Sequence, residues 1–78
     1  MNEWLARHAD VLARASGVAR DELELDETRI EAILDIAGYA AHDSGARTNA
    51  PLLCYLLGRA EAGASFDELA EEVRRSSS

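Results

Sequence analysis

The sequence predicts an all-α fold, a compact bundle of four helices with a short acidic connector between the first and second. Apolar residues recur with the helical period in four places, whereas no useful run alternates apolar and polar residues as a half-buried strand does. Only 5% of the residues are aromatic, which also disfavours strands. Since 78 residues give one small domain, we expect a single helical domain over residues 1–75 and a disordered tail over residues 76–78.

The first helix is expected from about Glu3 to Ala15, with Asn2 as its capping residue. Gly17 follows it and is free to adopt the left-handed conformation that ends many helices. The apolar side chains of this segment fall on one helix face. That face consists of Trp4, Leu5, His8, Val11, Leu12 and Ala15.

The acidic connector spans residues 18–25 and has room for one helical turn, with Leu23 and Leu25 expected to tuck onto the core. Two interpretations of its carboxylates stay open. They form either a solvated connector or a docking strip for a basic partner. The residues of this strip are Asp21, Glu22, Glu24 and Asp26.

The second helix is expected from about Glu27 to His42, and Asp43-Ser44-Gly45 should stop it. Asp26 or Thr28 is its cap, because residues 28–31 match the capping-box pattern. Its apolar stripe is Ile30, Ile33, Leu34, Ala37 and Ala41, widened by Ile36 and Ala40.

The third helix is expected from about Ala50 to Ala62, with Thr48 or Asn49 as the cap and Pro51 in the first turn. Leucines cover most sides of this segment, which is typical of a central helix around which the others pack. Only one sector is expected to face solvent, that of Cys54, Gly58 and Glu61.

The fourth helix is expected from about Phe66 to Arg75, opened by a capping box at residues 65–68. Its last turn carries Arg74 and Arg75, which suit the negative end of the helix dipole. Its stripe is Phe66, Leu69, Ala70 and Val73.

The net charge of −7 disfavours nucleic acid and anionic membranes as partners, and with them a DNA-binding transcription factor, because phosphate groups repel such a chain. It favours a basic protein partner instead. No eighteen-residue apolar stretch is present, so no membrane span is expected. The single cysteine, Cys54, allows no internal disulfide, and we expect a reduced, cytoplasmic setting.

Four short motifs lie between Ile33 and Glu72, namely I-L-D-I-A at 33–37, A-A-H at 40–42, R-T-N-A-P-L at 47–52 and Y-L-L-G at 55–58. In these motifs the chain resembles a family of short actinobacterial helical domains of unknown function. Members of that family stand alone or are fused to the guanylyltransferase that builds the molybdopterin–guanine dinucleotide cofactor. The resemblance implies an accessory role near molybdenum-cofactor maturation, and it implies no known catalytic residues.

One polar junction stands out between the second and third helices. His42 closes the former, while Arg47, Thr48 and Asn49 open the latter, where free backbone N–H groups form an anion site in principle. Arg47 adds a forked, charged donor for a phosphate or an acidic side chain. The competing interpretation is local: Thr48 or Asn49 caps the helix, and Arg47 pairs with Asp43.

No arrangement of side chains in the sequence indicates a reaction centre. His8 and Cys54 have no neighbours at metal-ligand spacing, and no nucleophile and base are paired. We therefore expect no enzyme, no cofactor and no metal. The predicted function is a non-enzymatic accessory or interaction domain whose partner is a cofactor-synthesis enzyme or a molybdoenzyme, with a homodimer as a further expectation. The alternative is a small binding domain for a nucleotide or cofactor phosphate at the junction of residues 42–49.

Overall fold

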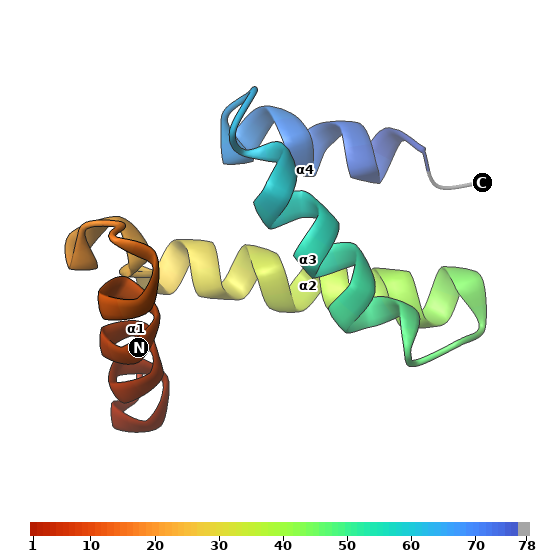
Figure 1. Cartoon of the computed structure of the whole chain (residues 1–78). Helices are drawn as coiled ribbons and strands as arrows, with labels where there is room; N and C mark the ends of the chain where they lie inside the picture. The colour runs from red at the N-terminus through yellow and green to blue at the C-terminus, as the bar shows by residue number, and fades with distance from the viewer. Residues whose placement is uncertain (77–78) are drawn as a thin grey trace. The chain divides into compact units, whose positions relative to one another are not determined.

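The computed structural model describes residues 1–76, and these contain helices and turns but no strand (Figure 1). The predicted all-α class, with four α-helices and an acidic connector between the first two, is confirmed. A single-turn 3-10 helix, η1, lies in that connector. The elements are α1 (Glu3–Ser16), η1 (Arg20–Leu23), α2 (Glu27–Ser44), α3 (Asn49–Ala60) and α4 (Phe66–Arg75).

The chain divides into two compact units, the first formed by Met1–Ile30 and the second starting at Glu31. The first unit holds α1, η1 and the first turn of α2, while the second holds the rest of α2 with α3 and α4. None of the helices in the described chain has the length and apolar character that crossing a bilayer requires.

Both ends of α1 follow the local signals in the sequence. The Leu5 N–H donates to the side-chain oxygen of Asn2 at 2.8 Å, which is a helix-capping bond. At the other end, Gly17 has φ +78° and its N–H donates to the Ala13 carbonyl at 2.9 Å. A left-handed residue at this position is cheapest as glycine, so the helix stops there.

Asp26 is the cap of α2, because its side chain accepts from the Arg29 N–H at 2.8 Å. The predicted capping box at residues 28–31 is wrong, since Thr28 already lies inside the helix, which begins at Glu27. The helix also continues past His42 to Ser44. Gly45 ends it with φ +73°, and its N–H donates to the Ala41 carbonyl at 3.0 Å.

The core of the second unit lies where α2, α3 and α4 meet. Each helix contributes a side chain that is almost wholly removed from solvent, and a ring of half-buried residues surrounds them. Ile36, at 1% exposure, is the most deeply buried. The buried residues are Ile36, Leu57, Phe66 and Ala70, and the half-buried ones packed on them are Ala32, Ile33, Leu53, Leu69 and Val73.

The stripe predicted for α4 is confirmed, since all of its members belong to this core. The helix begins as expected, with the Glu68 N–H donating to the Ser65 hydroxyl oxygen at 3.3 Å. It is closed by Ser76, whose N–H donates to the Glu72 carbonyl at 3.1 Å. Ser76 is the C-cap of α4, and residues 77–78 of the predicted tail lie outside the described residues.

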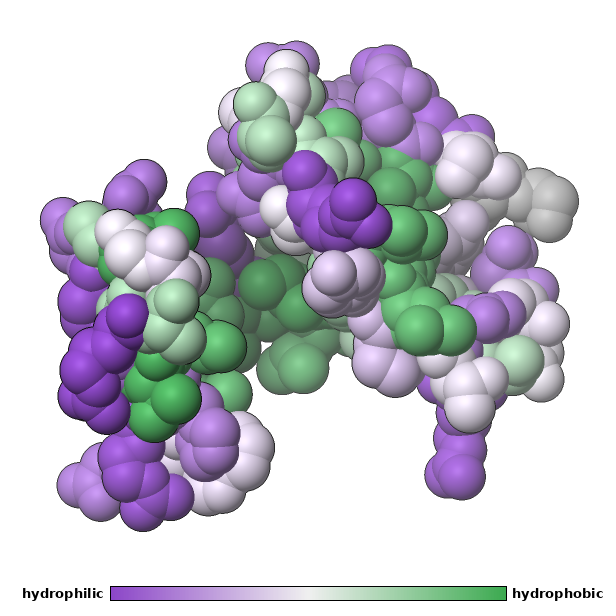
Figure 2. Space-filling view, viewed as in Figure 1, coloured by the Kyte–Doolittle hydropathy of each residue, from purple (hydrophilic) through white to green (hydrophobic). Residues whose placement is uncertain are grey.

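The prediction for α3 as a helix covered on most sides is wrong. Leu57 is buried, but Leu52 and Leu56 are each 59% exposed and Tyr55 is 64% exposed. Cys54, predicted to face solvent, is half-buried instead. In the second unit α2 and α4 cover one side of this short helix, so its other leucines stay at the surface, where Figure 2 shows hydrophobic residues in green.

Candidate functional site

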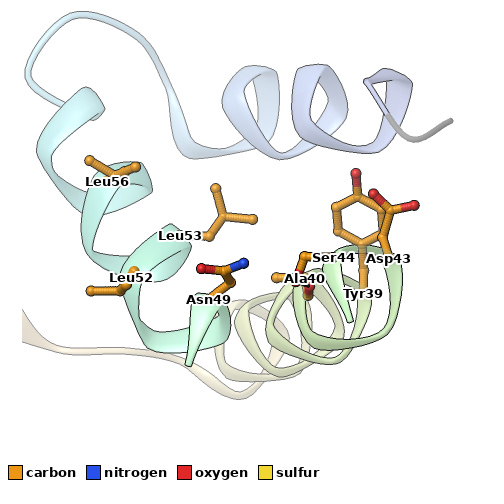
Figure 3. Close-up of a pocket in the computed structure, with 8 residues that line it drawn as sticks. All are labelled: Tyr39, Ala40, Asp43, Ser44, Asn49, Leu52, Leu53 and Leu56. Carbon is orange, nitrogen blue, oxygen red and sulfur yellow. Dashed lines mark hydrogen bonds between the residues drawn. The ribbon is translucent and has the colours of Figure 1, made fainter. Parts of the chain in front are cut away.

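A hollow of about 280 Å³ lies between the C-terminal half of α2 and the N-terminal half of α3. Figure 3 shows its two sides, with Leu53 of α3 opposite Tyr39 of α2. The lining residues are Tyr39, Ala40, Asp43, Ser44, Asn49, Leu52, Leu53 and Leu56.

A second hollow of about 290 Å³ lies between α3 and α4. Leu53 and Leu56 line both hollows, so the two are neighbours along α3. We call them together the leucine groove. The residues lining its second half are Leu53, Leu56, Leu57, Ala60, Leu69, Glu72, Val73 and Ser76.

The sequence builds this groove from simple helix spacing. Leu53 and Leu56 are three positions apart on α3, and Tyr39 and Asp43 are four apart on α2, so each pair shares a helix face. The turn of residues 45–48 returns the chain so that α3 follows α2 directly (Figure 1). Leu53 and Leu56 of α3 therefore lie between the α2 residues that line the first hollow and the α4 residues that line the second.

The charge of the groove is of one sign. Of the described residues that line it, only Asp43 and Glu72 are charged, and both are acidic. The Glu72 carboxylate pairs with Arg75 at 2.9 Å, and the same guanidinium also binds Glu71 at 2.8 Å, so this group of three keeps a net negative charge. The groove thus offers apolar contact beside acidic side chains on α2 and α4, and both of these acids also interact within the chain.

The residues predicted to hold an anion are only partly brought to this groove. Asn49 lines it, whereas His42, Arg47 and Thr48 are exposed and line neither hollow. Among the described residues that line the two hollows there is no cation, and a phosphate placed beside Asn49 would meet the Asp43 carboxylate.

The start of α3 also has few donors left for an anion. The Asn49 N–H donates to the Ala46 carbonyl at 3.0 Å and the Ala50 N–H donates to the Arg47 carbonyl at 3.1 Å. Pro51 has no N–H. Thr48 occupies the cap position, but its side chain makes no capping hydrogen bond, contrary to one of the sequence expectations.

Half of the predicted acidic docking strip is engaged inside the first unit. Asp26 caps α2, and Glu24 binds Arg20 with a separation of 2.8 Å between side-chain nitrogen and oxygen. Asp21 and Glu22, both exposed and in η1, are left to face solvent. The strip therefore offers a partner less negative charge than its sequence indicates.

Arg20 is a structural residue that the sequence interpretation missed. Its side chain also binds Asp10 of α1 at 2.6 Å, and these hydrogen bonds to Asp10 and Glu24 raise the pKa of the guanidinium above its ordinary value. A third contact reaches the Ala6 carbonyl at 3.4 Å. The only signal in the sequence was a single basic residue within an acidic connector.

His8 and Cys54 both have local structural surroundings. The His8 ring stacks on Trp4 with centroids 3.9 Å apart, and its Nδ1 lies 2.8 Å from the Trp4 carbonyl oxygen. The Cys54 Sγ lies 4.0 Å from the Ile33 carbonyl oxygen, and burial raises the pKa of this thiol. Within residues 1–76, no cluster of three or more His, Cys, Asp or Glu side chains is arranged to hold a metal ion.

The fold and the groove define a small all-α protein with an apolar, acid-edged surface between helices. The chain belongs to a family described as a domain of unknown function (DUF6457), whose model matches residues 1–78. Neither the curated proteins nor the solved structures compared with the chain give a match. The predicted membership in a domain family of unknown function is thus confirmed.

Proposed function

We propose that this chain is a non-enzymatic interaction domain that binds another protein in the leucine groove. The observation that carries the proposal is the exposure of Leu52 and Leu56, each at 59%, beside two apolar hollows. Contiguous exposed apolar surface on a small domain commonly marks an interaction site. Full burial of a leucine side chain stabilises a complex by about 1.5–3 kcal/mol. A partner that covers Leu52 and Leu56 therefore gains part of its binding free energy from these two side chains.

The proposed partner is a protein of molybdenum-cofactor maturation, either the guanylyltransferase that makes the dinucleotide cofactor or a molybdoenzyme. The support is the resemblance of the motifs at 33–37, 40–42, 47–52 and 55–58 to actinobacterial domains that occur alone or fused to that enzyme. A chain of net charge −7 with an acid-edged groove also favours a basic protein surface. This role places the chain in the cytoplasm.

The proposal is tested by calorimetric titration of the chain with the purified guanylyltransferase from the same organism. Leu56→Glu places a charge on the groove floor and should weaken binding at least about tenfold. Leu34→Glu is the matched control, because Leu34 is 64% exposed on α2 and does not line the groove, and it should bind normally. Absence of binding by the unmodified chain rules out this enzyme, and equal affinities of the two variants rule out the groove.

An anion site at residues 42–49 remains the alternative function, with less geometric support because Asn49 and Ala50 already use their N–H groups. Titration with phosphate and with a guanine nucleotide to about 5 mM, followed by amide NMR shifts, separates the two. Saturable shifts confined to residues 47–52 would favour the alternative, and no shift would remove it.

A further inference from the structure

We infer that the occupant of the leucine groove is an amphipathic helix with basic residues on both flanks, contributed by the partner protein. This inference rests on the proposed function and adds the chemistry of the segment that is bound. Three observations carry it: the shape of the groove, the sign of its charges, and the absence from residues 1–76 of a strand that could pair with an extended peptide.

The groove has the dimensions of a short helix. Asn49, Leu52, Leu53, Leu56 and Ala60 all line it, and they span the full 12 residues of α3. At 1.5 Å per residue this floor is about 18 Å long, which matches a partner helix of about three turns. The α3 side chains at these spacings form a row along the helix. Two helices pack when such a row on one of them fits between the side-chain rows of the other.

The backbone chemistry favours a helix over an extended peptide. All the walls are helices, whose interior N–H and C=O groups are paired along the helix, and residues 1–76 contain no strand to which another could be added. A bound extended peptide would lose water from its own backbone groups without gaining partners. A helical occupant pairs those groups internally and presents only side chains to the leucines.

The charges specify the flanks of the occupant. Asp43 lies on the α2 wall and Glu72 on the α4 wall, so a helix seated over Leu53 and Leu56 has an acidic residue on each side. Residues 31–78 hold eight acidic and four basic side chains, which repels an acidic helix. Lysine and arginine fit because their stems cover apolar surface while their charges reach the acids.

A second copy of this chain is a less favoured occupant, because each copy brings a net charge of −7. Sedimentation of the chain at about 100 μM checks this directly. A dimer that Leu56→Glu dissociates would mean that a second copy fills the groove, and it would overturn the inference.

The experiment is the selection of binders from a library of displayed random 14-residue peptides on the full chain, followed by measurement of the affinity of synthetic versions. Three variants sort the binders. Leu56→Glu disables the floor, the double variant Asp43→Arg/Glu72→Arg reverses both walls, and Glu31→Arg/Asp35→Arg changes the net charge equally on exposed α2 residues outside the groove. Circular dichroism confirms that each variant remains helical.

The inference predicts binders with a positive net charge and apolar residues at i, i+3 or i+4 and i+7. Their affinity should fall about tenfold in the wall variant and by less than about twofold in its charge-matched control. Binders that need Leu56 but are acidic or uncharged, or that ignore the wall variant, would overturn the inference and leave the proposed function standing. If no binder depends on Leu56, the proposed function fails as well.

Discussion

Leu34 and Ile36 lie two positions apart on α2, yet Leu34 is 64% exposed whereas Ile36 is 1% exposed. Successive helix positions are about 100° apart, so these side chains point to opposite sides. Ile36 meets Leu57 of α3 and Phe66 of α4 in the core, while Leu34 lies in the exposed part of the stripe predicted from sequence. This pair offers a direct comparison of a core contact with a surface one.

Truncation of Ile36 should remove much of the stability of the second unit. Ile36→Ala is expected to lower the free energy of unfolding by about 2–4 kcal/mol, and Ile36→Val by about 1 kcal/mol. Each substitution removes buried carbon atoms from the core and leaves a cavity in their place. Leu34→Ala should change it by less than about 0.5 kcal/mol. Urea denaturation followed by circular dichroism measures all three. Equal losses of unfolding free energy in Ile36→Ala and Leu34→Ala would contradict the placement of Ile36 in the core.

Substitution by alanine should change the stability of the chain in opposite directions at two glycines. Gly45 has φ +73°, where an L side chain costs about 1–2 kcal/mol, so Gly45→Ala should destabilise the chain by about that amount. Gly58 lies inside α3 with open space around the position of a Cβ, so Gly58→Ala should stabilise it by about 0.5–1 kcal/mol. Thermal unfolding of the two variants reports both signs, and destabilisation by Gly58→Ala would contradict the open surroundings.

Arg20 should hold η1 on α1, since its guanidinium reaches Asp10, Glu24 and the Ala6 carbonyl. In Arg20→Ala we expect faster hydrogen exchange at the amides of Glu22 and Glu24, which donate within η1 and its cap. Arg14→Ala, on the exposed surface of α1, is the control and should leave those rates unchanged. Unchanged exchange in Arg20→Ala would mean that half-buried Leu23 and Leu25 suffice to hold the connector.

The Cys54 thiol should make stability depend on pH in the alkaline range. Burial raises its pKa above the ordinary value of 9.0, so above that pH the unfolded chain loses this proton before the folded chain does. The free energy of unfolding contributed by the thiol is complete below pH 9.0 and falls as the pH rises through the folded pKa. Cys54→Ala should lose less stability than the unmodified chain between about pH 8 and pH 10, measured by urea denaturation. Identical losses in both chains would contradict the burial of this thiol.

The helices could be predicted because their signals are local. Asn2, Gly17, Gly45 and Ser65 each act within one turn of their own positions, and the structure uses all four as a cap or a stop. The α4 stripe was equally predictable, since its apolar residues occupy a single face.

The covered side of α3 and the role of Arg20 could not be predicted in the same way. A helix with leucines on most sides gives no periodicity that distinguishes Leu57 from Leu56, and the choice depends on where α2 and α4 pack. Arg20 and Asp10 meet across the turn that follows α1, and no spacing rule relates them. The leucine groove was missed for the same reason, because its floor is the side of α3 that was expected to be covered.

The central claim is that the leucine groove binds a protein segment, and amide NMR mapping of the isotope-labelled chain tests it most directly. On addition of the selected peptide or of the guanylyltransferase, we predict the largest shifts at Leu52, Leu53, Leu56 and Val73, with little change in α1. The same titration with Leu56→Glu should give no saturable shifts. Shifts confined to α1 or to residues 21–26, with the groove amides unmoved, would contradict the claim.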